Sequence, residues 1–159
     1  KNILKKFRII GIDIDIRKHN EKAIKAHKMY ENIEMYEGSS IDKDILKNIK
    51  KNIKKKDKVL VILDSNHSSS HVYNELTLYS KLVTKNSYIV ACDGIQKKMI
   101  GAPRSKRDWE MNNPITAIKK FLKTNKNFKE SNNNFAFNES KLNINYVTYW
   151  PNAYIKKIR

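Results

Sequence analysis

The sequence has 159 residues, of which 40% are hydrophobic, and a formal net charge of +17. This length fits one domain, and the apolar content suffices for a buried core, which argues against global disorder. No apolar run is long enough to span a bilayer and the N-terminus has no apolar signal segment, so we expect a cytoplasmic protein without a membrane span. Cys92 is the only cysteine, which excludes an internal disulfide framework.

The positive charge has two interpretations. Lys, Asn and Ile are frequent everywhere in the chain, as a strongly AT-rich coding sequence would produce, and charge runs are usually solvated faces. The alternative is a nucleic-acid-binding module that uses a dense basic helix face, made of Lys47, Lys50, Lys51, Lys54, Lys55 and Lys56. Tyr and Trp are not interleaved with these lysines, so stacking platforms for bases are not evident. We therefore do not expect nucleic acid to be the main partner.

Buried-strand patterns alternate with amphipathic helix patterns along the chain. The expected elements are a strand at 8–15, a helix at 20–30, a strand at 33–36, a helix at 42–54, a strand at 59–64, a helix at 72–83, a strand at 88–91, a long loop at 94–113, a helix at 114–123, and an antiparallel hairpin with a turn at 132–134 and a strand at 144–149. Asn113 and Pro114 fit the cap and the first turn of the last helix.

Alternating strands and helices predict a mostly parallel sheet built from βαβ units. Right-handed crossovers place the carboxyl ends of all parallel strands on one edge, where such sheets bind ligands. Four polar residues are expected at this edge: Asp13, Ser39, Asp64 and Asp93.

The first two strand ends are candidates for nucleotide binding. Asp13 or Asp15 could bind both hydroxyls of a ribose, and Asp13 is favoured because it lies in a Gly-x-Asp pattern. Each acid could equally cap the following helix. Gly38 and Ser39 could allow the backbone to approach an adenine ring, although Gly-Ser-Ser is also common in turns.

The segment from Asp64 to His71 carries the strongest chemical signal. Asp64 ends an apolar strand, where its carboxylate could bind a hard cation, and Asp93 could complete the ligand set. His67, in the loop above, could take a proton from a substrate hydroxyl. The competing interpretation is structural: Asp64 and Ser70 would cap the next helix, and His67 would be a solvent-exposed residue.

Several motifs together resemble one known family. They are Ile9 to Arg17, Gly38 to Asp42, Leu63 to His67, His71-Val72 with Glu75-Leu76 and Tyr79, Tyr88 to Val90 with Asp93-Gly94, and Tyr149 to Tyr154. From about Ile9 to its end, the chain resembles the cephalosporin hydroxylase and rhamnosyl O-methyltransferase family. The resemblance implies a Rossmann-like class I methyltransferase that binds S-adenosylmethionine, often binds Mg²⁺, and methylates a hydroxyl of a sugar, glycan or natural product.

The resemblance also implies roles for particular residues. Asp13 would bind the cofactor ribose, with Asp15 and Asp64 as further candidate cofactor contacts, and Gly38 and Ser39 would border the adenine. Asp64 and Asp93 would hold the metal, and His67 would be the general base.

Two departures from the family pattern stand out. Cys92 replaces an acid that usually precedes the residue matching Asp93, and a thiol is a poor Mg²⁺ ligand. The family's first strand and glycine-rich loop precede the position of Lys1. We therefore expect residues 1–159 to form a single methyltransferase-like domain that is incomplete at its N-terminus. The exposed apolar edge of the sheet could then pair with a second copy of the chain.

Two other functions remain open from the residues alone. His67, His71 and Asp64 could hold non-haem Fe(II) in a hydroxylase, although a triad from so short a segment would be strained. The chain could also be an inactive fragment, with weak cofactor affinity as its signature.

Overall fold

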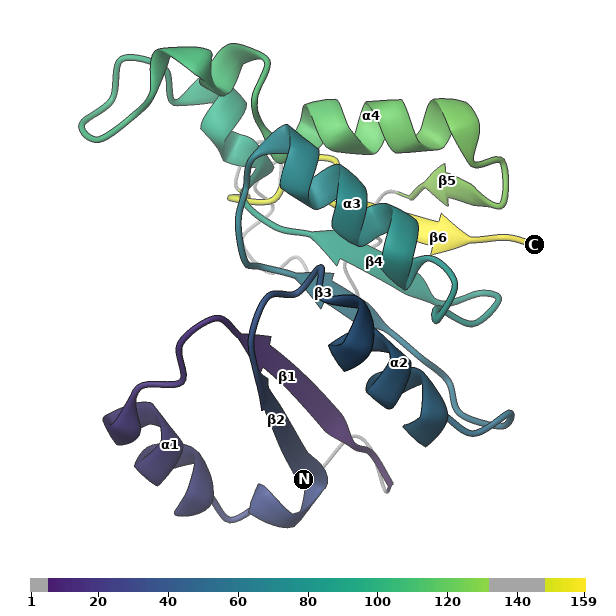
Figure 1. The fold of residues 1–159 in the computed structure, drawn as a ribbon. Coiled ribbons are helices and arrows are strands. Elements are labelled where there is room, and N and C mark those ends of the chain that lie inside the picture. The colour runs from purple at the N-terminus through teal and green to yellow at the C-terminus, as the bar shows by residue number, and fades with distance from the viewer. Residues whose placement is uncertain (1–5, 132–147) are drawn as a thin grey trace, which may run out of the picture. The chain divides into compact units, whose positions relative to one another are not determined.

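The computed structural model describes residues 6–131 and 148–159. The chain divides into two compact units, with the boundary between Lys54 and Lys55. Both units combine helices with strands, so the predicted α/β class is confirmed (Figure 1). Each unit is described in its own right below.

The first unit is built around a βαβ element. Its strands β1 (Ile9–Asp13) and β2 (Ile33–Glu37) are parallel, with Ile9 opposite Ile33 and Asp13 opposite Glu37. Helix α1 (Lys18–Lys25) and the short 3₁₀ helix η1 (Tyr30–Asn32) connect them. The two strands therefore end at the same edge, as the sequence predicts for parallel strands.

Helix α2 (Lys43–Asn52) completes the first unit. It begins after Asp42, whose side chain accepts hydrogen bonds from the backbone N–H groups of Asp44 and Ile45 and so caps the helix. Its apolar stripe buries Leu46 and Ile49, as the spacing predicts. The lysines at 47, 50 and 51 lie exposed on the helix surface, as expected of a solvated face.

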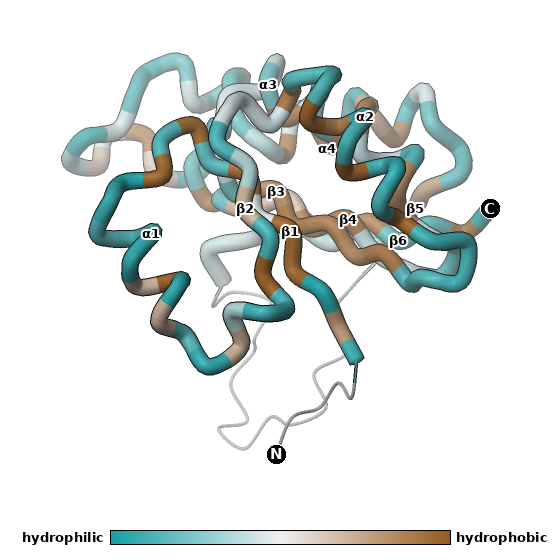
Figure 2. Tube along the Cα trace, turned by 60° about the horizontal axis from the view of Figure 1, so that its bottom comes forward, coloured by the Kyte–Doolittle hydropathy of each residue, from teal (hydrophilic) through white to brown (hydrophobic). Residues whose placement is uncertain are grey.

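The second unit contains a four-stranded sheet in the order β3-β4-β6-β5. Its strands are β3 (Val61–Leu63), β4 (Tyr88–Ala91), β5 (Phe128–Glu130) and β6 (Tyr154–Lys157). β3 and β4 are parallel, whereas β6 runs antiparallel to both of its neighbours. Figure 2 shows that β3 and β4 are largely hydrophobic along the trace, but only β4 is buried as predicted: Ile89 and Val90 are at most 5% exposed, whereas Ile62 of β3 is 60% exposed.

Helices α3 (Ser69–Tyr79) and α4 (Pro114–Thr124) pack against each other beside this sheet (Figure 1). The core between helices and strands includes Leu76, Ile89, Ile118 and Ile155, all almost completely buried. The Asn113 side chain accepts a hydrogen bond from the Thr116 N–H, and Pro114 occupies the first turn of α4. The predicted cap of this helix is thus confirmed.

Segment 94–113 is more ordered than the expected loop. It contains two short 3₁₀ helices, η2 (Gly94–Lys98) and η3 (Arg107–Glu110), joined by turns. Such turns form locally, through bonds such as Ser105 N–H to the Ala102 carbonyl, and produce no long apolar period in the sequence.

The expected C-terminal hairpin is partly wrong. Its turn at 132–134 and most of its strand, at 144–147, lie outside the described residues. Thr148 and Tyr149 are not in a strand, and the strand of this region is β6 at Tyr154–Lys157. Antiparallel pairing does occur, but between β6 and the two strands β4 and β5.

In the described ranges, 6–131 and 148–159, every helix is too short or too polar to cross a bilayer.

Candidate functional site

The register of β3 and β4 brings two predicted site residues together. Leu63 lies opposite Ala91, and the Cys92 N–H donates to the Leu63 carbonyl at 2.9 Å, which extends the pairing by one residue. Both chain segments then leave the sheet, with Asp64 directly after β3 and Asp93 just after β4. Carboxylates that follow two neighbouring parallel strands therefore project from the same edge of the sheet.

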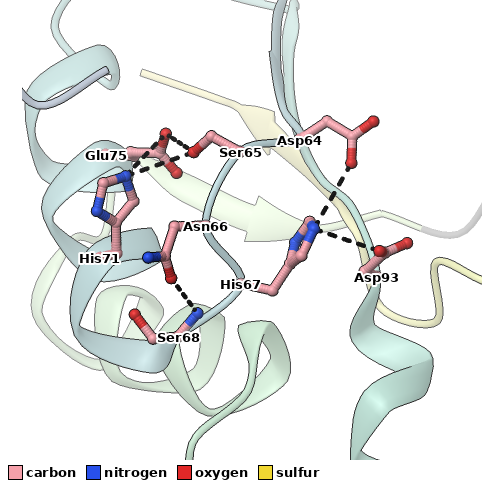
Figure 3. A network of polar contacts seen from close by, with 8 residues as sticks. All are labelled: Asp64, Ser65, Asn66, His67, Ser68, His71, Glu75 and Asp93. Carbon is pink, nitrogen blue, oxygen red and sulfur yellow. Dashed lines mark hydrogen bonds and ion pairs between the residues drawn. The ribbon is translucent and has the colours of Figure 1, made fainter. Parts of the chain in front are cut away.

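His67 lies between these two carboxylates (Figure 3). Its Nε2 atom is 3.3 Å from Asp93 Oδ2 and 3.9 Å from Asp64 Oδ1. One ligand atom from each of the three side chains lies within 4.8 Å of the others, a spacing that could hold a metal ion. The His67 side chain is 21% exposed, whereas those of Asp64 and Asp93 are 60% and 38% exposed. The site is therefore an open polar cluster at the surface of the second unit.

The structural interpretation of this segment does not hold in the described residues. Helix α3 begins after Ser68, whose own side chain makes no capping hydrogen bond, and the Asn112 side chain accepts a hydrogen bond from the Ser69 N–H at 2.8 Å. The Asn66 side chain instead accepts a hydrogen bond from the Ser68 N–H at 2.9 Å and forms a local turn. Asp64 is thus free of a capping role and His67 faces the carboxylates, as the functional interpretation requires.

The backbone at Asp93 is unusual. Its φ of 57° lies in the left-handed region, which Asp tolerates better than most residues but which still costs free energy. Within the described chain its carboxylate does not cap η2. Positive φ at a non-glycine residue is often found where a side chain must be aimed at a ligand.

Cys92 lies beneath the cluster and is only 1% exposed. Burial, reinforced by the negative charges of Asp64 and Asp93, raises the pKa of its thiol to about 12. Without a bound cation the thiol is therefore protonated at neutral pH, and a thiol is a poor ligand for a hard cation such as Mg²⁺.

The residues present still fit Mg²⁺. This ion is usually bound through one or two carboxylates and keeps several water ligands. Asp64 and Asp93 supply two carboxylates, while Cys92 in place of a third acid lowers the charge of the site. We expect weaker binding than at a site with three acids, with Asp64 and Asp93 as the ligands.

His71 belongs to a different group of contacts. Its Nε2 atom is 3.5 Å from Glu75 Oε1 and 3.4 Å from Ser65 Oγ, so it is directed towards the buried side of α3 (Figure 3). The three residues proposed as iron ligands, Asp64, His67 and His71, are therefore not brought together in this structure. The group whose spacing could hold a metal ion contains Asp93 in place of His71.

In the first unit, the predicted cofactor residues lie at the shared end of β1 and β2. The Gly38 N–H donates to the Asp13 carbonyl at 2.8 Å, which joins the two strand ends. Asp13 Oδ1 accepts a hydrogen bond from the Asp15 N–H, and both acids are exposed. The helix cap is Arg17, and neither acid caps α1 in the part of the chain described. An exposed carboxylate at a strand end remains available to hydroxyl donors such as those of a ribose.

The turn after β2 requires glycine. Gly38 has a φ of 145°, and a Cβ there would lie 2.7 Å from Ile45 Cδ1. Ser39 follows, and its carbonyl accepts a hydrogen bond from the Asp42 N–H, which leads the chain into α2. The Gly38-Ser39 turn therefore has a clear structural role, and its contact with adenine stays a prediction.

Sequence reasoning missed the role of Glu75. This residue is 1% exposed, although it carries a carboxylate, and its Oε1 accepts a hydrogen bond from Ser65 Oγ at 2.7 Å. Its position between Val72 and Tyr79 on the buried face of α3 was the available signal, because an acid at such a position needs a polar partner inside the fold.

An α/β fold with carboxylates after its parallel strands is typical of Rossmann-like proteins, a class in which ligands bind at the strand ends. Residues 1–158 match the family model described as rhamnosyl O-methyltransferase/CmcI, and the chain belongs to this family. The predicted methyltransferase fold is confirmed.

A solved structure supports the fold assignment. It is the MycE methyltransferase from the mycinamycin biosynthetic pathway, in complex with Mg and SAH, with a TM-score of 0.54 and 15% sequence identity. The similarity covers 98% of this chain but 46% of that chain, so this chain spans about half the length of that methyltransferase. No curated protein sequence matches the chain significantly.

Proposed function

We propose that the protein transfers a methyl group from S-adenosylmethionine to a hydroxyl of a sugar, glycan or natural product, assisted by Mg²⁺ and with His67 as the general base. The observation that carries the proposal is the convergence of His67 with Asp64 and Asp93 in a member of an O-methyltransferase family. The partner is therefore a small-molecule or glycan acceptor, and nucleic acid is not required.

The cofactor contacts in this proposal are Asp13 and Asp15 for the ribose, Gly38 and Ser39 for the adenine, and Asp64. The cation ligands are Asp64 and Asp93. When bound, S-adenosylmethionine supplies an electrophilic methyl group, and Mg²⁺ makes the acceptor hydroxyl more acidic. The related MycE methyltransferase forms a complex with both Mg and SAH, which supports the same pair of ligands here.

The chain's own residues move the proton. Methyl transfer requires the acceptor hydroxyl to lose its proton, and the His67 imidazole accepts it. The ring then gains a positive charge, which interacts favourably with the Asp93 carboxylate at 3.3 Å and the Asp64 carboxylate at 3.9 Å. His67 is partly buried, so its ring is held in position yet remains accessible to an acceptor.

The test is methyl transfer from deuterium-labelled S-adenosylmethionine to a panel of nitrophenyl glycosides, including the rhamnoside, with products detected by mass spectrometry. His67→Ala should lower turnover by about 100-fold or more, and cofactor affinity should stay nearly unchanged. His19→Ala is the matched control, because His19 is an exposed histidine on α1. Full turnover by His67→Ala would show that His67 is not the base.

A further inference from the structure

Helix α3 buries a carboxylate that the proposed chemistry does not use. Glu75 is 1% exposed and lies on the same helix face as the core residues Val72 and Leu76. Burying a charged or polar group costs free energy unless partners inside the fold compensate for it. Among the described residues, no group donates a hydrogen bond to its buried Oε2 atom. A side chain of this type is poorly suited to stabilise the core, which points to another reason for its presence.

The other oxygen of Glu75 reaches the loop that carries the candidate site. Oε1 accepts a hydrogen bond from Ser65 Oγ at 2.7 Å, across ten positions of the sequence, and lies 3.5 Å from His71 Nε2 (Figure 3). Hydrogen bonds to a carboxylate are shorter and stronger than those between neutral groups. Ser65 directly follows Asp64 and precedes His67 by two residues. The bond therefore ties the segment between these two site residues to the buried side of α3.

The three side chains do not form a nucleophilic triad. In such a triad, the histidine stands between the hydroxyl and the carboxylate and uses a different ring nitrogen for each. Here Ser65 Oγ and Glu75 Oε1 both approach the same atom, His71 Nε2, and Ser65 also donates directly to Glu75. The carboxylate consequently holds the hydroxyl and the ring in place and does not activate the serine.

We propose that Glu75 is a positioning residue that acts through Ser65 to hold Asp64 and His67 in the geometry required by the reaction. The inference rests on the proposed function, because it concerns the same cluster of Asp64, His67 and Asp93. Groups that orient a reactive side chain or a metal ligand commonly matter as much as the ligands, since small misplacements slow a reaction strongly.

Three variants test the proposal. Ser65→Ala removes the donor, Glu75→Leu removes the acceptor at similar volume, and Glu75→Gln keeps an oxygen that can accept the Ser65 hydrogen bond. Ser80→Ala is the matched control, because Ser80 is also buried at the end of α3 and donates a side-chain hydrogen bond, to the Thr77 carbonyl. Glu75→Leu should remain folded, since apolar replacements of buried charged groups are often neutral for stability.

Two measurements are needed on each variant. The first is amide hydrogen exchange of residues 64–68, which should become about tenfold faster in Ser65→Ala and Glu75→Leu but not in Ser80→Ala. The second is the kinetics of methyl transfer, in which kcat should fall by about 10- to 100-fold with little change in the KM for S-adenosylmethionine. Glu75→Gln should recover most of both properties.

Unchanged exchange at residues 64–68 in both Ser65→Ala and Glu75→Leu would overturn the proposal. If Glu75→Leu does not fold, Ser65→Ala decides alone, because Ser65 is exposed and its loss removes only the hydroxyl. If the wild type lacks methyl transfer but these variants still exchange faster, the proposed function is refuted, and what stands is that Glu75 and Ser65 hold the segment of Asp64 and His67 in place.

Discussion

The turn that follows β2 offers a prediction whose size can be worked out from the structure. Gly38 combines a φ of 145° with a position where a new Cβ would meet Ile45 Cδ1 at 2.7 Å. Gly38→Ala therefore imposes two costs, one on the backbone and one on the neighbouring side chain. Gly101→Ala imposes only the first, because φ is 88° there and no heavy atom lies within 4 Å of the added Cβ.

The backbone cost of such a conformation is about 1–3 kcal/mol. Moving the partly buried Ile45 away from its preferred rotamer adds about 0.5–1.5 kcal/mol. Alanine also lowers the conformational entropy of the unfolded chain, which stabilises the folded protein by about 0.4–1 kcal/mol. We therefore expect Gly38→Ala to lower the free energy of unfolding by about 2 kcal/mol, and Gly101→Ala by about 1 kcal/mol.

The assay is urea unfolding followed by circular dichroism, with amide exchange at Ile45 and Leu46 to locate the loss within the first unit. A second substitution, Ile45→Ala, should recover part of the difference between the two glycine variants, since it removes the atom that clashes. If the single variants Gly38→Ala and Gly101→Ala are equally stable, Ile45 does not lie as close to position 38 as the structure shows.

Other substitutions test the remaining assignments. Asp13→Ala should weaken S-adenosylmethionine binding by roughly tenfold or more, measured by calorimetry; unchanged affinity would remove the ribose assignment. Because the Cys92 thiol has a pKa of about 12 in the folded protein and an ordinary value of 9.0, stability should fall as pH rises from about 9 to 12. Cys92→Ala should flatten that part of the pH profile, and an unchanged slope would contradict the shift. Asn113→Ala should cost about 3 kcal/mol in thermal unfolding, since the buried amide caps Thr116 and also donates to the carbonyl of Trp109; a loss below about 1 kcal/mol would contradict this.

The sequence predicts best the elements that depend on one local feature, such as an apolar run or a capping residue. The apolar runs at β3 and β4 predict neighbouring strands, and their polar ends locate Asp64 and Asp93 at one edge, although Ile62 of β3 is exposed and not buried. The parallel register then brings the two carboxylates together, as expected. Asn113 and Pro114 also predict the start of α4 correctly, because capping depends on residues close in the sequence.

The missed elements depend on contacts between distant residues. Strand β6 ends in two lysines, which hide its apolar pattern. Lys157 nevertheless fits there, since its amino group donates to the carbonyls of Ser80 and Val83 after α3. Glu75 is similar, because its burial becomes understandable only when Ser65 and His71 are placed beside it. Long-range partners such as those of Lys157 leave no local signal, whereas the position of Glu75 on an apolar helix face does signal a buried acid.

The proposed function requires this chain to bind a methyl donor together with a cation, so that the methyl group can pass to a hydroxyl. The most direct test is a calorimetric titration of S-adenosylmethionine into the protein, with and without Mg²⁺, for the wild type and for His67→Ala. We expect saturable binding at one site for both proteins. An absence of cofactor binding with and without Mg²⁺ would contradict the proposed function.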